Sequence, residues 1–211
     1  KLIYALCDGT PSTPEWRFTD KWPVSENMRK LYFSAKPGNT INNGFMEEDI
    51  PSKVSSQVYR VDYETTTGES TRFDNGVGGK FNYSNLKDND SRGITFTTPV
   101  LENNIIAVGH PIVRICLQGK ITDDVSLFVY FEKVHQDGFS EYITEGCLNL
   151  LFHKLVSNNW DCFGLPIHVS TEDQVHSNGF TSIKELTIDL QPIAYIFEKG
   201  SRIRVTITCA D

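Results

Sequence analysis

The feature that most constrains this chain is a strict alternation of apolar and polar residues over residues 202–209. Ile203, Val205 and Ile207 occupy every second position, and two arginines and two threonines occupy the positions between them. Successive side chains of a β-strand point to opposite faces, whereas a helix would scatter these residues around its axis. The pattern therefore predicts a half-buried antiparallel strand, with the apolar residues in the core and the arginines on a wetter face.

Strand-like patterns recur along the rest of the chain. Residues 58–63 and 186–191 also alternate, and residues 125–131 are apolar on both faces, as is typical of a central strand covered on both sides. The turn-forming dipeptides between such runs are Asp8-Gly9, Asn43-Gly44, Asn75-Gly76, Asp137-Gly138, Asn178-Gly179 and Lys199-Gly200. Only residues 147–155 are compatible with a helix, and that helix would be short.

Two polar stretches, residues 40–56 and 75–93, interrupt these patterns. Strand-like sequence resumes directly after each, so we interpret both as long surface loops rather than linkers between domains. Short strands with turn signals between them are typical of a sandwich of two antiparallel sheets. The sequence therefore predicts a single all-β domain over residues 1–211, a β-sandwich of jelly-roll type with long loops.

The charge balance narrows the range of partners. The chain carries 20 Lys and Arg residues against 27 Asp and Glu residues, a formal net charge of −7, which argues against nucleic acid or an anionic membrane surface. No run of about 18 apolar residues is present, so no membrane-spanning helix is predicted. The chain starts with Lys1 and shows no leader pattern, and we therefore expect it to be a piece of a longer protein.

The five cysteines form no CxxC pair and their number is odd, which argues against a disulfide scaffold and against a zinc site. Cys116, Cys147 and Cys209 lie in apolar, strand-like runs, where a free thiol behaves as a small hydrophobic residue. We therefore expect these three residues to be buried and reduced. Reduced thiols fit a cytoplasmic protein.

The sequence lacks the patterns of common catalytic and metal sites. Ser70 and Ser140 each lie close to one glycine but lack the second glycine of a G-x-S-x-G nucleophile elbow. The five histidines show no paired metal spacing. Residues 88–90 and 123–124 offer carboxylates but do not fit a calcium-binding loop, and we interpret both as solvated loops. We therefore expect no catalytic residue, no metal and no cofactor in this chain.

The aromatic residues leave one binding function open. Trp16, Trp22 and Trp160 are able to stack on sugar rings, and the first two lie close together in the sequence. Tryptophans in a domain of this size are more often core residues or anchors of an interface with another protein. A carbohydrate-binding module, with Trp16 and Trp22 in its site, stays open as the alternative function.

Five motifs occur in an order that resembles a known family. They are WRFTDKWPV with KLYFSA, YRVDY, SRGITFTTPVLENNIIAVGHPIVRICL, TDDVSLFVYFEKVHQDGFSEYITEGCLNL, and LTIDLQPIAYIFEKGSRIRVTITCAD. Together they are similar to the X-Pro dipeptidyl-peptidase C-terminal domain. This family is the galactose-binding-like jelly roll that ends serine hydrolases of the CocE/NonD group, which includes X-Pro dipeptidyl peptidases, cocaine esterase and α-amino acid ester hydrolases. The likeness runs from Trp16 to Asp211.

The chain departs from the family pattern at three positions. Ser201 stands where the family has a histidine, Gly93 where it has an aspartate, and Asn149 where it has an arginine. These departures mark the chain as a divergent member.

The resemblance implies a non-catalytic accessory domain. In this family the Ser-His-Asp triad belongs to a separate α/β-hydrolase domain upstream in the same polypeptide, and loops of the C-terminal domain reach the cleft between the two. The resemblance therefore implies that catalytic domain as the partner, and a homo-oligomer is a further expectation. Phe81 and Tyr83 follow a glycine pair in such a loop, and we expect at least one of the two rings to line the substrate cleft.

Overall fold

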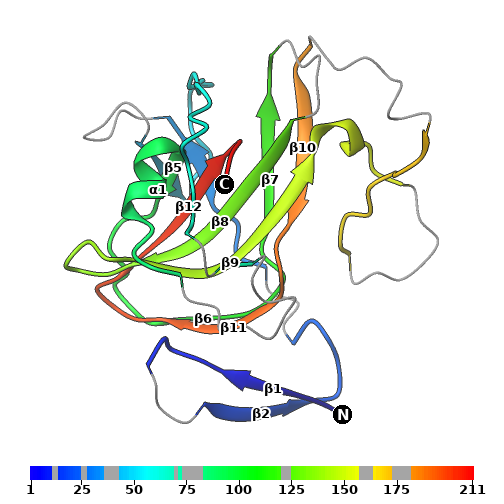
Figure 1. The fold of residues 1–211 in the computed structure, drawn as a ribbon. Helices are drawn as coiled ribbons and strands as arrows, with labels where there is room; N and C mark the ends of the chain where they lie inside the picture. Colours follow the sequence, from blue (N-terminus) through cyan, green and yellow to red (C-terminus); the bar gives the residue numbers. More distant parts are fainter. Residues whose placement is uncertain are drawn as a thin grey trace.

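The computed structural model describes most of the chain. The described residues are 1–10, 14–24, 28–35, 43–68, 71–72, 83–119, 125–156, 164–172 and 182–211. In chain order the elements are β1 (Leu2–Leu6), β2 (Glu15–Thr19), β3 (Tyr32–Ser34), β4 (Asn43–Glu47), α1 (Lys87–Arg92), β5 (Ile94–Thr97), β6 (Ile105–Gly109), β7 (Ile112–Leu117), β8 (Ser126–Val134), β9 (Ser140–Asn149), the 3-10 helix η2 (Leu150–Phe152), β10 (Lys184–Asp189), β11 (Ile193–Phe197) and β12 (Arg202–Thr208). Figure 1 shows the strands arranged around a common interior, with α1 on the outside next to β5 and β12.

The alternating segment forms β12, an inner strand of the largest sheet. Within the described residues that sheet has six strands in the order β3-β4-β5-β12-β8-β9. β12 pairs antiparallel with β5 on one side and with β8 on the other, whereas β4 and β5 pair in parallel. The antiparallel strand predicted at this position is confirmed, and so is the central position of β8 between β12 and β9.

Shorter strand pairs pack against this sheet and complete a sandwich. β10 pairs with β7, and β11 pairs with β6, both antiparallel. The core residues from the large sheet include Leu127, Val129, Leu148, Ile203, Val205 and Ile207, and those from the two pairs include Val113, Leu186, Ile188, Tyr195 and Phe197. All of these are buried. The all-β sandwich and the buried apolar face of β12 are therefore confirmed.

The opposite face of β12 is wetter at its arginines, as predicted, since Arg202 and Arg204 are partly exposed, but it is not wet along its whole length. Only 18% of the Arg204 side chain is exposed, and Thr206 and Thr208 are fully buried. α1 lies over this face, and its Asp90 accepts hydrogen bonds from Arg204 Nη1 at 2.6 Å and from Thr206 Oγ1 at 3.0 Å. Arg204 and Thr206 bind this buried carboxylate in place of water, and Thr208 donates to the carbonyl oxygen of Ala210 at 2.9 Å.

The helix α1 itself was not expected. Residues 88–90 were interpreted as a solvated loop, but they lie in α1 and Asp90 is buried. α1 approaches β12 closely because Gly93 follows it: a Cβ atom at residue 93 would lie 2.9 Å from the carbonyl oxygen of Ile207. Conversely, residues 147–155, the only candidate for a helix, form the end of β9 and the 3-10 helix η2 in their first part.

Two further predictions about strands were wrong. Residues 58–63 form no strand, and Val58 and Tyr63 are exposed. Tyr59 instead anchors this segment, because its hydroxyl accepts a hydrogen bond from the backbone nitrogen of Cys209 at 3.3 Å. β4 forms inside the stretch interpreted as a polar loop, and the Asn43-Gly44 dipeptide starts this strand rather than a turn. A local alternating or polar pattern does not show whether a neighbouring strand is available for pairing.

The cysteines are more exposed than predicted. Cys116 and Cys147 are exposed, and Cys209 is partly buried. Ile115 on β7 and Leu148 on β9, which are the neighbours of Cys116 and Cys147, pack in or against the core. Because successive side chains of a strand point to opposite faces, each thiol lies on the other face. Burial raises the pKa of Cys209 to about 11, which keeps that thiol protonated.

A second acid is buried close to Asp90. Glu132 on β8 is fully buried and accepts a hydrogen bond from Ser140 Oγ at 2.6 Å. Burial, and after it the charge of Asp90, raises the pKa of Glu132 well above its usual value. The folded protein therefore keeps this carboxyl protonated to a higher pH than the unfolded chain does.

Glu132→Gln should make the stability of the domain less dependent on pH. Because the pKa of Glu132 is raised on folding, its contribution is complete below the unfolded value of 4.5 and is lost as the pH rises through the folded pKa. A neutral amide of the same shape carries no such loss. Relative to wild type, the variant should therefore gain free energy of unfolding between about pH 5 and about pH 8, as urea unfolding would measure. Glu102→Gln, at an exposed position, serves as control. A difference in free energy of unfolding between Glu132→Gln and wild type that is the same at about pH 5 and about pH 8 would contradict the expectation.

Candidate functional site

Tyr83 is the one of the two predicted cleft residues that the structure describes, since Phe81 lies outside the described residues. The Tyr83 ring stacks on Tyr142 of β9, with 3.7 Å between the ring centroids and 3° between the planes. Its hydroxyl donates to Glu145 Oε1 at 3.3 Å. Burial, and then the negative charge of Glu145, raises the pKa of Tyr83 to about 12, so the phenol stays neutral. The start of the segment after Phe81 is thus fixed on β9.

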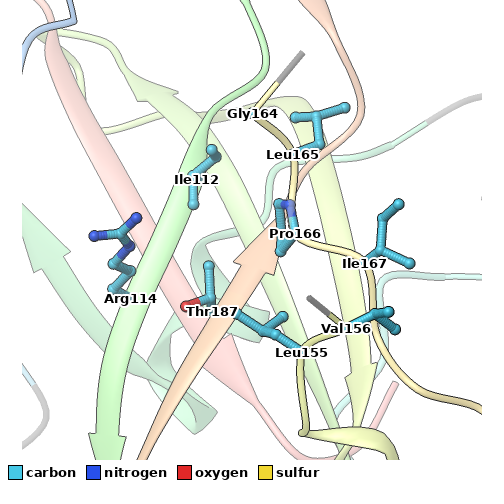
Figure 2. Close-up of a pocket in the computed structure, with 9 residues that line it drawn as sticks. All are labelled: Ile112, Arg114, Leu155, Val156, Gly164, Leu165, Pro166, Ile167 and Thr187. Atoms are coloured by element: carbon cyan, nitrogen blue, oxygen red, sulfur yellow. The ribbon is translucent and has the colours of Figure 1, made fainter. Parts of the chain in front are cut away.

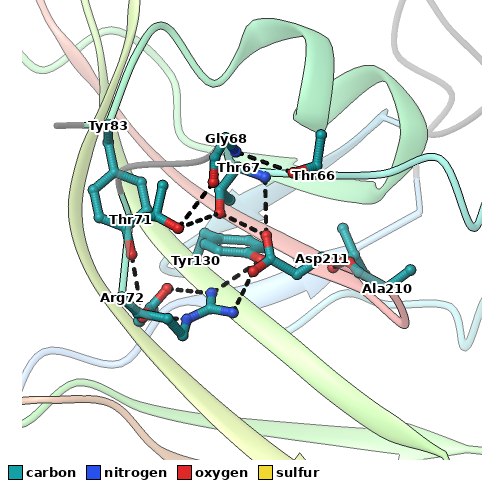
Figure 3. A network of polar contacts seen from close by, with 11 residues as sticks. Thr66, Thr67, Gly68, Thr71, Arg72, Tyr83, Tyr130, Ala210 and Asp211 are labelled. Atoms are coloured by element: carbon teal, nitrogen blue, oxygen red, sulfur yellow. Dashed lines mark hydrogen bonds and ion pairs between the residues drawn. The ribbon is translucent and has the colours of Figure 1, made fainter. Parts of the chain in front are cut away.

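Tyr83 belongs to a group of charged and phenolic side chains around Arg72, drawn in Figure 3. This Arg72 cluster consists of Arg72, Tyr83, Tyr130, Glu145 and Asp211. The guanidinium donates to both oxygens of Glu145, through Nε at 2.6 Å, and also to Asp211 and to the hydroxyl of Tyr130. Only 17% of the Arg72 side chain is exposed, against 7% for Glu145 and 4% for Asp211. The planar, forked guanidinium suits such a two-sided contact with carboxylates.

The Arg72 cluster joins segments that lie far apart in the sequence. Asp211 also accepts hydrogen bonds from Thr67, from its backbone nitrogen at 2.9 Å and from its hydroxyl at 2.6 Å. The guanidinium carbon of Arg72 lies 5.0 Å from the ring centroid of Phe128 on β8. One network therefore holds the segment around residues 67–72, the β8–β9 pair and residue 211 together.

The chemistry of the Arg72 cluster is that of a structural site. Burial opposes the charge on Arg72, but the hydrogen bonds to Glu145 and Tyr130 raise the pKa of Arg72 above its ordinary value. A guanidinium held in this way does not exchange protons at physiological pH. Glu145 and Asp211 are engaged by the same cation, whereas a general base must face the proton that it removes from a substrate.

A small pocket lies where the segment after η2 meets β7 and β10, as Figure 2 shows. Its volume is about 200 Å³, and it is lined by Ile112, Arg114, Leu155, Val156, Gly164, Leu165, Pro166, Ile167 and Thr187. Pockets for small-molecule ligands usually reach about 300–1,000 Å³ and present several convergent polar groups. This pocket is smaller and mostly aliphatic, so it does not by itself define a ligand site.

The two tryptophans of the alternative function lie in different surroundings. Trp16 is on β2 and is exposed, and its cross-strand neighbour is Ala5. Trp22 lies in the bend after β2 and packs edge-on against His110, with 6.3 Å between the ring centroids. A sugar site combines an aromatic ring with polar groups beside it, and Ala5 provides none. A role of Trp16 and Trp22 in sugar binding stays a prediction.

Ser140, one of the two serines noted in the sequence, is fully buried and donates to Glu132. The other, Ser70, lies outside the described residues. Among the residues that the structure describes, no group of three or more His, Cys, Asp or Glu side chains is placed to hold a metal ion. No helix in the same ranges is both long and apolar enough to cross a membrane.

Taken together, these features define a β-sandwich domain in which clustered ionisable groups hold segments of the fold to one another. Over residues 1–211 the chain matches the family described as the X-Pro dipeptidyl-peptidase C-terminal non-catalytic domain, and it belongs to that family. The resemblance inferred from the motifs is thereby confirmed.

Several relatives carry this domain within a longer protein. The chain is 30% identical over 201 residues to "Putative serine esterase Mb1866c" of Mycobacterium bovis. The matched region covers 93% of this chain and 31% of that protein. The CocE/NonD family hydrolase SACOL2612 from Staphylococcus aureus matches with a TM-score of 0.65 and 15% identity, over 99% of this chain and 33% of that one. An α-amino acid ester hydrolase matches with a TM-score of 0.62 and 15% identity, over 92% and 31%. The two structures show a shared fold, and the chain spans about a third of each relative's length.

These comparisons also bear on the alternative function and on the departures from the family pattern. They give no support to a carbohydrate-binding module, and the galactose-binding-like subtype of the sandwich stays a prediction. The unusual residues have local structural roles. Asn149 Oδ1 accepts from the backbone nitrogen of Leu151 at 3.0 Å and starts η2. Ser201 Oγ donates to the carbonyl oxygen of Glu198 at 2.6 Å in the turn before β12.

Arg72→Lys should destabilise the domain although it keeps the charge. A lysine ammonium cannot contact Glu145, Asp211 and Tyr130 in the same forked geometry, and a buried carboxylate is then left without its donor. We expect a loss of about 1–3 kcal/mol in the free energy of unfolding, measured by urea titration. Arg17→Lys is the matched control, because Arg17 pairs with the exposed Glu15, and its unfolding midpoint should stay unchanged. Equal midpoints for the two variants would contradict a structural role of the Arg72 cluster.

Proposed function

We propose that this domain is the C-terminal accessory part of a serine hydrolase whose Ser-His-Asp triad lies in an upstream α/β-hydrolase domain of the same polypeptide. The observation that carries the proposal is the match to the mycobacterial protein named as a serine esterase, which extends over 93% of this chain. Esters are therefore the substrate class that we favour, ahead of X-Pro peptides and amides.

The role of the domain in such an enzyme is to pack on the catalytic domain and to form one wall of the substrate cleft. The charged groups in the Arg72 cluster and around Asp90 are bonded to one another, which suits a scaffold. Large apolar side chains nevertheless stay exposed, among them Trp16, Phe18 and Ile50. Exposed apolar surface of this kind is typical of a face that another domain covers.

The residues next to Phe81 support its proposed place at the cleft. Glu145 contacts Arg72, which precedes the segment that carries Phe81, and Tyr83, which follows it. One buried carboxylate thus fixes the two described neighbours of that segment on the same strand. Phe81 and Tyr83 would supply contact area for the substrate rather than chemistry, so they would act by positioning.

The free thiols favour a cytoplasmic location for this enzyme. Cys7, Cys116 and Cys147 are exposed and unpaired by disulfides, and exposed thiols persist best where the compartment is reducing. Assembly into a homo-oligomer stays a prediction.

The hydrolase function predicts a clear division of activity. The full-length protein should hydrolyse aryl esters, and a fluorophosphonate probe should label a serine upstream of Lys1. The 211-residue chain alone should hydrolyse neither aryl esters nor X-Pro dipeptide anilides, because an isolated serine or histidine lacks the rest of a triad. A full-length protein that neither turns over these substrates nor reacts with the probe would rule out the proposal.

Phe81→Ala and Tyr83→Ala should each lower kcat/KM of the full-length enzyme by about tenfold or more, through loss of substrate positioning. Tyr83→Phe separates the ring from the hydroxyl, since it keeps the stacking on Tyr142 but loses the hydrogen bond to Glu145. Tyr63→Ala is the control, because Tyr63 is exposed and outside the Arg72 cluster. Wild-type kinetics for both alanine variants on several esters would exclude this segment from the cleft.

A further inference from the structure

The β1–β2 hairpin presents an apolar face that the described part of the domain leaves open. Strand pairing sets Ile3 opposite Phe18 and Ala5 opposite Trp16, so these four side chains share one side, here called the hairpin face. Ile3 is 61% exposed, Trp16 60% and Phe18 67%. Leu6, on the other side of β1, is 3% exposed. The hairpin therefore has an inner and an outer side, and the outer side is apolar.

The hairpin is attached to the sandwich through the end of β1. The backbone nitrogen of Cys7 donates to the carbonyl oxygen of Ala194 at 2.9 Å, and that of Ile196 donates to the carbonyl oxygen of Cys7 at 2.8 Å. Figure 1 shows the hairpin, in blue, next to the β6–β11 pair and away from the six-stranded sheet. A two-stranded hairpin is marginally stable in water unless a face packs against something. Leu6 already packs the end of the inner side, and a partner on the hairpin face would add packing on the outer side.

The composition of the hairpin face indicates what kind of partner fits. The residues opposite Trp16 and Phe18 are Ala5 and Ile3, and neither has a polar side chain. Sugar recognition needs hydrogen-bonding groups beside the aromatic ring, and the polar residues Glu15 and Arg17 of the same strand alternate to the other side and bond to each other. Clustered Trp and Phe residues with aliphatic neighbours are instead typical of the centre of a protein–protein interface.

The position of the hairpin in the chain indicates where that partner comes from. The family is described as a C-terminal domain, and the curated relative is about three times as long as the part matched here, since the match covers 31% of it. In a protein of this kind the remaining chain precedes the domain. β1 and β2 are the first strands of the region that matches the family, so they lie at the end of that region to which an upstream domain would connect.

We propose that the hairpin face is the docking surface for the upstream domain of the same polypeptide, with Trp16 and Phe18 as its anchoring side chains. The proposal rests on the proposed function for the identity of that domain, the α/β-hydrolase. It adds the surface through which the two domains are joined, which neither the family description nor the relatives' names assign.

Hydroxyl-radical footprinting of the full-length protein tests this directly. Each residue's oxidation rate is divided by its rate in the urea-unfolded protein, which removes differences in intrinsic reactivity. Tyr63, which is 85% exposed and lies outside the hairpin, is the internal reference. We expect Trp16 and Phe18 to react at least about tenfold more slowly than Tyr63, because anchoring side chains at an interface exclude solvent. Rates comparable to that of Tyr63 would overturn the proposal.

A pair of double variants identifies the partner. Trp16→Ser/Phe18→Ser removes the anchors, and Val54→Ser/Val58→Ser removes two apolar residues elsewhere that are even more exposed. In the full-length protein the first variant should raise hydrogen exchange about fivefold or more in upstream peptides that lose their cover, and the second should not. Circular dichroism checks that both variants remain folded. Unchanged exchange in every upstream peptide of the first variant would contradict docking on that domain.

Three outcomes separate this proposal from the alternatives. Protection of Trp16 that disappears when the protein is diluted to a monomer would assign the hairpin face to a second copy, and the proposal would be wrong. A full-length protein that keeps the protection but shows no hydrolase activity would refute the proposed function and leave the docking surface intact. Hydrolase activity combined with an open hairpin face would refute the docking surface alone.

Discussion

The carboxylate of Asp90 lies over the polar face of β12, 2.6 Å from Arg204 Nη1, and makes that face part of the protein interior. Burying a charged pair costs free energy unless hydrogen bonds replace the lost water. Here Thr206 also donates to Asp90, and Arg204 Nε donates to Thr97 on the neighbouring strand at 3.0 Å. With this contact, β12 is covered on both faces and can occupy an inner position in the sheet. The apolar face packs the sandwich core, and the polar face holds α1.

The residues that carry the family resemblance contact one another across the fold. Asp62 of the YRVDY motif accepts a hydrogen bond from Arg92 of the SRGITFTTPV motif at 2.8 Å. Tyr59 of the former accepts one from the backbone of Cys209 near the end of the last motif. Asp211, the last residue of that motif, binds Arg72, which lies outside the five motifs. Residues of these motifs thus fix distant segments of the fold relative to one another.

Local patterns in the sequence predicted the parts of the fold that depend on local geometry. The burial of Ile203, Val205 and Ile207 follows from the period of two, because one face of a strand must be apolar when it meets a core. The same rule failed for residues 58–63, where no partner strand is present in the described structure. It also failed for Cys147, since the rule fixes alternation but not which of two faces meets the core.

The parts that could not be predicted depend on pairs of residues far apart in the chain. Asp90 and Arg204 are separated by 114 positions, and Arg72 and Asp211 by 139. A charged residue in a polar stretch is interpreted as solvated when its partner is unknown. The local sequence therefore did not predict α1 or the Arg72 cluster. For the proposed cleft, the sequence identified Tyr83 but not Glu145, which holds it.

Gly93 limits which residues the neighbouring strand can carry. The carbonyl of Ile207 and the methyl groups of Thr206 and Thr208 would each lie 2.9 Å from a Cβ atom at residue 93. Contacts that short require the neighbouring strand to shift. Any residue with a Cβ atom meets the same three contacts. A side chain can therefore be accommodated at residue 93 only together with a change in β12, so these positions are not free to vary one at a time.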